Sequence, residues 1–448
     1  MMKKFKKVVL TIIVVIFSLT LSSCMGREPN EIAYIVALGI DKAENGNYEI
    51  TIQYANTTQI SGGASEEGGK VGNQIVENIT VEAPTIYGAI GLANHIVSKT
   101  FTLSHAKLIV FSKEVAEEGL KDLVETFIRS EELRPDVYLA VASDKANKYL
   151  TEMNPAMEVN PAKYYQLIFD KNALIGMPDG VAKNFFFSVE TNDYDSLLPL
   201  AGVLESQEEQ GGEQSGGGSG SSSEEGSGSS SGGSSGTSQE DTKNEKQKDA
   251  PINDSKFEYK IKSYTGGQAA IEQKNKSEAI GSAVFRDDKM VGTIGSVETE
   301  IYKLLIGDYE YSYLTLYNQK TPETPVTVKS MKQKLPRYDI DIENKRIKIR
   351  LFIEGDIYSL PADYNIESDI ENFEENSEKY IEEASEKFIK DFMKQYNCDI
   401  FRFSERAKPK FLTNDEYNKF KDTVDYSKYD FDVEVKFEVR RTGLIVRD

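Results

Sequence analysis

The chain has very few of the side chains on which most enzyme chemistry depends. Its 448 residues include two cysteines, two histidines and no tryptophan. With only Cys24 and Cys398 present, a framework of disulfide bonds is excluded. The two histidines, His95 and His105, do not form an HExxH motif, and no CxxC, GxSxG or kinase signature occurs. The sequence therefore nominates no catalytic residue, no metal ligand and no cofactor-binding residue.

Hydrolytic chemistry is left open at two points. A Ser-His-Asp triad could recruit Ser104 and His105, which are adjacent in "LSH". Neighbouring side chains in or near a strand point to opposite faces, so we expect no direct hydrogen bond between this pair. The sequence neither identifies nor excludes a pair of carboxylates of the glycosidase type, because acidic residues occur throughout and a sequence does not show which of them lie close together. Cys398, at the end of a helical pattern, is expected to be a buried, inert thiol.

The chain also lacks an apolar run of the length that a permanent membrane crossing needs. The run Val8–Leu21 would be about 21 Å long as a helix, whereas the hydrocarbon core of a bilayer is about 30 Å thick. Four lysines precede the run and small residues follow it, which is typical of an export signal. We therefore expect residues 1–23 to be a signal peptide.

The end of this signal, Leu21-Ser22-Ser23-Cys24, resembles the bacterial lipobox. The resemblance implies that the Cys24 thiol receives a diacylglyceryl group and becomes the new N-terminus. Two acyl chains suit stable anchoring, because a single chain gives only marginal membrane binding. An ordinary secretory signal with an incidental cysteine is the alternative. We expect Cys24 to be the lipid attachment site and residues 24–30 to form a short tether.

Basic residues are outnumbered by acidic ones, 53 against 73, which gives a net charge of −20. Such a surface is repelled by nucleic acid and by anionic lipid headgroups. We therefore expect no nucleic-acid partner. An acidic protein of this kind needs a covalent tether or a protein partner to stay at a membrane.

The sharpest change of composition is a Gly/Ser/Glu-rich segment, residues 206–250, with almost no apolar side chains. Such a segment cannot bury enough surface to offset its ordering entropy, so we predict a long disordered linker. It has no GxxxxGK[ST] phosphate-binding pattern. The linker separates an N-terminal α+β domain or domains, residues 31–205, from a C-terminal α+β domain, residues 251–448.

In the first block, "EIAYIVALGID" predicts a strand that is buried on both faces, and "YEITIQY" predicts a second strand. The Asn-Gly pair between them predicts a β-hairpin. Helical patterns follow in "APTIYGAIGLANHIVSK" and "EVAEEGLKDLVETFIRS", and "AKLIVFS" and "DVYLAVAS" predict further strands.

In the second block, "RIKIRLFIEGDI" and "FDVEVKFEVRR" alternate between apolar and polar residues, which predicts antiparallel strands with one wet face. Between them, residues 367–396 predict a long amphipathic helix that covers the dry face. We interpret its acidic outer face as solvated surface rather than a metal site. The fold class is α+β, with mixed or antiparallel sheets, packed helices and two to three subdomains.

Several segments, taken in order, resemble the Ger(x)C family, the lipoprotein C subunits of nutrient germinant receptors in spore-forming bacteria. They are the lipobox with "EIAYIVALGIDK" close behind it, "LSHAKLIVFSKEVAEEGLKDLVETFIRSEELRPDVYLAVA", "IGSAVFRDDKMVGTIG", "YNCDIFRFSE" and "VEVKFEVRRTGLI". The resemblance implies a non-enzymatic α+β protein, usually of three subdomains, that works with two polytopic membrane subunits. It also implies a location on the outer face of the spore inner membrane, where the protein helps to trigger germination by scaffolding or gating those subunits.

The chain departs from the family pattern at two places. Met25-Gly26 stand where the family often has Trp-Asp, and Arg402 and Ser404 stand where it tends to have glycines. Two other functions stay as alternatives. A substrate-binding lipoprotein of a transporter would have two α/β lobes around a hinge, and a cell-wall hydrolase would have a carboxylate pair in a groove. Contact with a nutrient, and the identity of that nutrient, are not specified by the sequence.

Overall fold

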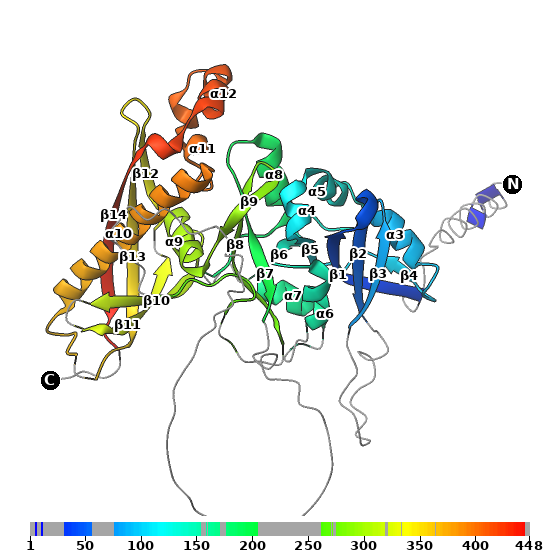
Figure 1. Cartoon of the computed structure of the whole chain (residues 1–448), viewed down its shortest axis with the longest axis horizontal. Coiled ribbons are helices and arrows are strands. Elements are labelled where there is room, and N and C mark those ends of the chain that lie inside the picture. The colour runs from blue at the N-terminus through cyan, green and yellow to red at the C-terminus, as the bar shows by residue number, and fades with distance from the viewer. Residues whose placement is uncertain are drawn as a thin grey trace, which may run out of the picture.

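The structure is a computed structural model in which two β-sheets lie side by side (Figure 1). It describes residues 5–6, 10–11, 31–55, 76–153, 158, 160–170, 176–204, 261–269, 271, 275–318, 321–332, 334–362 and 364–443. Cys24, the tether and the predicted linker 206–250 lie outside these residues. Both sheets carry helices, as the predicted α+β class requires.

The first sheet has nine strands in the order β3-β2-β1-β5-β6-β7-β8-β9, with β4 paired to β1. Its strands are β1 (Ile32–Lys42), β2 (Tyr48–Ala55), β3 (Val76–Ala83), β4 (Thr100–Thr102), β5 (Leu108–Ser112), β6 (Tyr138–Ala142), β7 (Leu197–Val203), β8 (Ser277–Arg286) and β9 (Lys289–Ile294). The central strands β1, β5, β6 and β7 are parallel, and antiparallel strands flank them on both sides.

Helices cover both faces of this sheet, which explains the nearly continuous apolar runs of its parallel strands. On β5, Ile109 and Phe111 belong to one apolar core, while Leu108 and Val110 belong to another. The first core takes side chains from α3 (Ile86–Ala93), α4 (Lys113–Glu118), α5 (Lys121–Ile128) and α8 (Ala182–Thr191). The second takes side chains from α6 (Ala146–Glu152) and α7 (Pro161–Phe169).

The predicted hairpin and the strands and helices of this block are confirmed. Strands β1 and β2 are antiparallel neighbours joined through η2 (Glu44–Gly46), where Asn45 and Gly46 have φ values of 67° and 78°. An Asn-Gly pair adopts this left-handed conformation at low cost. The helical pattern at residues 114–130 is divided between α4 and α5, because Gly119 has a φ of 131° and ends the first helix.

Strands from beyond the predicted linker complete the first sheet. β8 pairs antiparallel with β7, and β9 pairs with β8. Where the chain leaves β7 and returns to β8, the Leu204 N–H donates to the Lys276 carbonyl at 2.8 Å. The first sheet therefore contains strands from both sides of residues 206–250.

The second sheet has five strands: β10 (Tyr311–Asn318), β11 (Thr321–Lys332), β12 (Arg337–Asp341), β13 (Arg346–Ser359) and β14 (Asp430–Arg441). The prediction that β13 and β14 are antiparallel is wrong, because they pair in parallel over nearly their whole length. Parallel neighbours need a long crossover, and α10 (Ile370–Tyr396), α11 (Phe403–Ala407) and α12 (Asn414–Thr423) provide it. Alternation along a strand reports which face is buried and carries no information on strand direction.

An apolar core lies between this sheet, α9 (Ser296–Ile306) and α10. The inward positions predicted on β13 and β14 are buried, including Ile347, Ile349, Val435 and Phe437. The predicted helix 367–396 is confirmed as α10. The core also includes Leu197, Val284 and Ile294 of the first sheet, so the two sheets share apolar contacts.

Four glutamates of α10 contact the edge of β14. The carboxylates of Glu374, Glu378, Glu382 and Glu386 accept the backbone N–H groups of Val439, Phe437, Val435 and Val433, at 2.7, 3.0, 2.9 and 3.0 Å. We call this set the glutamate ladder.

The spacing of the ladder follows from elementary geometry. Four residues of helix rise about 6.0 Å, and two residues of strand rise about 6.6 Å. Glutamates spaced four residues apart on α10 therefore face the backbone N–H groups of alternate residues on β14. The interpretation of the acidic face as solvated surface is therefore wrong for these four residues.

Candidate functional site

The predicted lipid attachment site, Cys24, lies outside the described residues and stays a prediction. The other cysteine, Cys398, is buried as predicted, and burial raises the pKa of its thiol to about 12. A thiol with so high a pKa forms little of the reactive thiolate at neutral pH.

Ser104 and His105 do interact, so the prediction of no direct hydrogen bond is wrong. The Ser104 Oγ and the His105 Nδ1 are 3.0 Å apart. The cause is local: the two residues form a turn after β4, where the alternation of strand side chains does not apply.

The charged groups near this histidine do not favour a catalytic triad. Burial lowers the pKa of His105, and the charges of Arg134 and Lys107 lower it further. The Thr102 hydroxyl lies 3.3 Å from both the Ser104 hydroxyl and the Glu132 carboxylate. Glu132 is therefore linked to Ser104 through Thr102, and not to His105. A triad needs the acid to orient the histidine.

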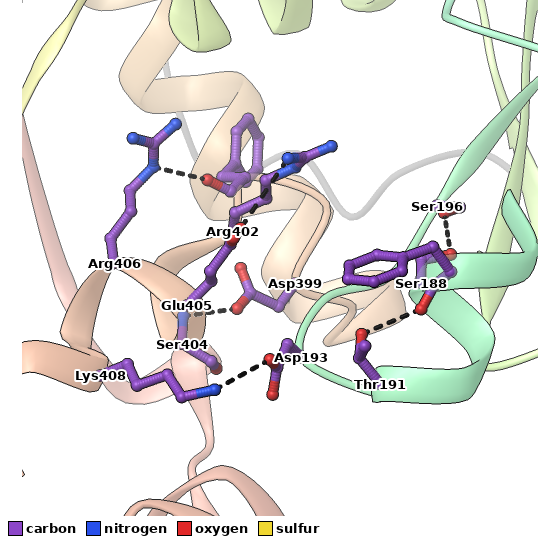
Figure 2. A network of polar contacts seen from close by, with 12 residues as sticks. Ser188, Thr191, Asp193, Ser196, Asp399, Arg402, Ser404, Glu405, Arg406 and Lys408 are labelled. Atoms are coloured by element: carbon purple, nitrogen blue, oxygen red, sulfur yellow. Dashed lines mark hydrogen bonds and ion pairs between the residues drawn. The ribbon is translucent and has the colours of Figure 1, made fainter. Parts of the chain in front are cut away.

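A network of polar contacts lies where the loop from α8 to β7 meets the segment that follows α10 (Figure 2). We call this region, formed by residues 192–196 and 399–408, the junction. The Asp195 carboxylate accepts the backbone N–H groups of Asp399 at 2.7 Å and Asp287 at 3.0 Å. The Asp195 N–H in turn donates to the Asp399 carbonyl at 3.2 Å. The two bonds with Asp399 join the first sheet to the segment that follows α10, whereas the bond with Asp287 ties the loop before β7 to the turn between β8 and β9.

Asp399 organises the short helix α11. Its carboxylate accepts the backbone N–H groups of Phe403 and Ser404, both at 2.7 Å, although burial raises the pKa of this carboxyl to about 6. The Ser404 hydroxyl lies 2.9 Å from the Tyr426 hydroxyl. The turn between Asp399 and Phe403 passes through Arg402, whose φ of 61° is in the left-handed region.

Asp193 forms the solvent side of the junction. Its carboxylate lies 3.3 Å from the Lys408 Nζ and 3.6 Å from the Lys421 Nζ, and it accepts a hydrogen bond from the Tyr417 hydroxyl at 3.0 Å. Figure 2 shows Lys408 and Asp193 facing each other across the junction. The Lys408 side chain is 47% exposed, so its ion pair contributes little by itself. The Lys421 and Asp193 side chains are only 15% and 18% exposed. Both ion pairs add to the backbone contacts of Asp195.

A cavity of about 280 Å³ adjoins the junction. Its wall is formed by α8 and the loops on either side of it, the start of β7, α9 and the segment around α11. It carries three aspartates, two arginines, two tyrosines and several apolar side chains. The charged and aromatic lining residues are Asp179, Asp195, Asp308, Arg402, Arg406, Phe185, Tyr194 and Tyr302. The Arg402 guanidinium lies over the Tyr194 ring, 4.0 Å from its centroid.

The sequence pointed to only one part of this site. Arg402 and Ser404 were noted because they occupy positions where the resemblance implies glycine, and the structure places Arg402 in the conformation that glycine adopts most easily. The aspartates of the junction carried no recognisable signal, because their partners are backbone amides from distant segments. Among the residues that the structure describes, no group of histidines, cysteines and carboxylates is arranged to hold a metal ion.

The fold and the junction define an α+β protein in which two sheets are joined by the contacts of Asp195 with Asp399 and by a shared apolar core. Comparison with known proteins gives the family. Residues 26–203 match the family described as "Spore germination protein N-terminal domain", and residues 280–443 match "Spore germination B3/ GerAC like, C-terminal". The chain therefore belongs to the Ger(x)C family of spore germination proteins.

Two relatives come from Bacillus subtilis (strain 168). Spore germination protein KC is 28% identical over 164 residues, which cover 35% of this chain and 40% of that protein. The putative spore germination protein YfkR is 25% identical over 151 residues, which cover 34% of this chain and 38% of that protein. The chain thus spans about two fifths of the length of these relatives. The crystal structure of the GerBC protein is similar over 90% of this chain and 96% of that chain, with 15% identity and a TM-score of 0.48.

Proposed function

We propose that this chain is a lipid-anchored, non-enzymatic subunit of a nutrient germinant receptor on the outer face of the spore inner membrane. It helps to trigger germination by scaffolding or gating two polytopic membrane subunits. The observation that carries the proposal is the order of the two family matches, one on each side of the linker, behind a lipobox-like sequence.

The start of the fold supports a position close to the membrane. Strand β1 begins at Ile32, so a lipid on Cys24 is separated from the first sheet by residues 25–31. At about 3.3–3.6 Å per extended residue, this tether reaches at most about 25 Å. In the described part of the chain, no helix has the length and apolar character that a bilayer crossing requires.

The net charge supports a protein partner at this membrane-proximal surface. A charge of −20 disfavours direct contact with anionic headgroups. A short tether nevertheless holds the first sheet near them. Extracytoplasmic loops of the polytopic subunits would cover this surface, with contacts mainly from residues 27–205.

The test is to recover the tagged protein from spore membranes after cross-linking and to identify what accompanies it. We expect two polytopic subunits with the wild-type chain. Cys24→Ala should release the protein from the membrane fraction, and mass spectrometry of the wild-type N-terminus should find diacylated Cys24. Absence of any polytopic partner, or hydrolysis of cell-wall material by the purified protein, would overturn the proposal.

A further inference from the structure

The outer side of helix α3 is apolar, although it points away from the core. The exposed residues of this helix and its two ends, which we call the α3 face, are Pro84, Thr85, Tyr87, Gly88, Gly91, Leu92, His95 and Ile96. Leu92 and Ile96 are 51% and 71% exposed, and residues four apart on a helix are neighbours. The outer side of a surface helix is ordinarily polar. Adjacent exposed apolar side chains mark a surface that contacts a partner or a membrane.

The stretch of sequence that forms this face carries no acidic side chain. Residues 83–113 contain no aspartate or glutamate, although 73 of the 448 residues of the chain are acidic, about one in six. The same stretch contains three lysines and both histidines of the chain. Anionic headgroups therefore do not repel this stretch, whereas they repel the acidic surface elsewhere.

Two acids on neighbouring elements are held against the protein by hydrogen bonds. The Glu82 carboxylate accepts the side-chain amide of Asn47 at 2.8 Å. The Glu132 carboxylate accepts the Leu103 N–H at 3.1 Å. Both carboxylates are therefore engaged within the first sheet and its loops.

The proposed lipid tether enters the fold beside the α3 face. Strand β4 pairs in parallel with the start of β1, so that Ile32 lies opposite Thr100. Ile96 precedes Thr100 by four residues, so the two Cα atoms are at most about 14 Å apart. Since residues 25–31 reach at most about 25 Å, a lipid on Cys24 holds the end of α3 close to the bilayer. Figure 1 shows α3 toward one end of the molecule and the second sheet at the other.

We propose that the α3 face contacts the lipid bilayer directly, with Leu92 and Ile96 at the boundary between headgroups and acyl chains. Interfacial helices bury their apolar side by about 5–10 Å at this depth. Tyr87 suits the same boundary, because its ring is apolar and its hydroxyl, which donates to the Ser130 hydroxyl at 2.6 Å, is polar. The inference rests on the proposed lipid anchor, because the tether brings the face to the bilayer.

The contact is local and is compatible with the proposed protein partners. The net charge of −20 disfavours a broad contact with anionic headgroups, so only the edge without acids lies on them. Extracytoplasmic loops of the membrane subunits would cover the neighbouring surface of the first sheet. Lipid is favoured over such a loop at the α3 face itself, because the tether fixes the distance of this face from the bilayer and from no loop.

The absence of tryptophan from the chain makes the contact measurable, because a single introduced indole is the only one present. Ile96→Trp places this reporter on the α3 face. Leu412→Trp, at a 95% exposed position just before α12, is the matched control. Each full-length, lipidated variant is reconstituted in vesicles of phosphatidylglycerol and phosphatidylcholine, with or without bromine on the acyl chains. Bromine quenches indole fluorescence on contact, so we expect quenching in Ile96→Trp and none in Leu412→Trp.

An added carboxylate tests the electrostatic part of the inference. Leu92→Asp, combined with Ile96→Trp, should abolish most of the quenching, because anionic headgroups repel a carboxylate and the acyl region excludes it. Leu92 is exposed, so the melting temperature should not change. Leu335→Asp, at another exposed leucine, should leave the quenching by brominated lipid unchanged. Equal quenching with and without Leu92→Asp would contradict the proposed contact.

Flotation of the vesicles separates this inference from the proposed function. If the Ile96→Trp protein floats with the vesicles but is not quenched, the anchor holds and the α3 contact is wrong. If the protein does not float, the anchor is wrong and the inference falls with it. In spore membranes, a photo-cross-linker at position 96 should label lipid, and labelling of a protein in its place would overturn the assignment of the bilayer as the occupant.

Discussion

The glutamate ladder between α10 and β14 allows a quantitative test of how the second sheet is stabilised. Glu382 is a middle member, and its Oε1 accepts the Val435 N–H at 2.9 Å. Glu382→Ala removes the acceptor and leaves the partly buried Val435 N–H without a hydrogen-bond partner from α10. A hydrogen bond to a charged group contributes about 1.5–3 kcal/mol, and an unsatisfied buried amide costs about 1–3 kcal/mol. We therefore expect a loss of about 1–3 kcal/mol in the free energy of unfolding.

Two further variants separate the hydrogen bond from other effects of the substitution. Glu382→Gln keeps an oxygen acceptor without its charge and should lose less than Glu382→Ala, because charge-assisted bonds are about twice as strong as neutral ones. Glu375→Ala, at an exposed position of the same helix, reports the change in helix propensity alone.

The assays are urea denaturation and hydrogen exchange of peptides that cover residues 430–441. Exchange within β14 should be accelerated most by Glu382→Ala, less by Glu382→Gln and not by Glu375→Ala. If Glu382→Ala and Glu375→Ala lost the same stability and exchanged alike, the ladder would contribute nothing, and water would satisfy the strand edge equally well.

Three other predictions concern titration, the linker and the tether. Burial raises the pKa of Glu300 from 4.5 to about 7. The folded state therefore holds this proton more tightly, and stability should fall by up to about 3 kcal/mol as the pH rises from about 4.5 to about 7. Urea denaturation at pH 5 and pH 8 should show a smaller difference for Glu300→Gln, and an identical difference would refute the assignment. Deleting residues 210–248 should change thermal stability little, since each doubling of loop length costs only about 0.6 kcal/mol; a large loss would mean that the segment makes stabilising contacts. A flexible insert of about 20 residues after Arg27, which adds up to about 70 Å of reach, should weaken nutrient-triggered germination in spores without changing the melting temperature, and normal germination would contradict the proposed role of the short tether.

The sequence predicted what depends on local patterns and missed what depends on distant partners. The Asn45-Gly46 turn and helix α10 follow from rules that act over a few residues, and both are confirmed. The parallel pairing of β13 and β14 depends on the path of a long crossover, which alternation within each strand does not record.

The junction was invisible in the sequence for a related reason. Asp195 and Asp399 bind backbone amides, so no second side chain marks their partners. The hydrogen bond between Ser104 and His105 was missed because a turn was interpreted as strand. Only Arg402 and Ser404 were marked in the sequence, because they stand where the family resemblance implies glycine.

The pairing of β7 with β8 also has a consequence for the order in which the protein folds. The chain is made from its N-terminus, so β7 emerges before residues 204–276 and long before its antiparallel neighbour β8. Until β8 arrives, the hydrogen-bonding edge of β7 is open to other strands. The first sheet cannot be completed while only the N-terminal block has been made. Its folding therefore waits for synthesis of β8 and β9, and a chain stalled within residues 204–276 would present an open sheet edge.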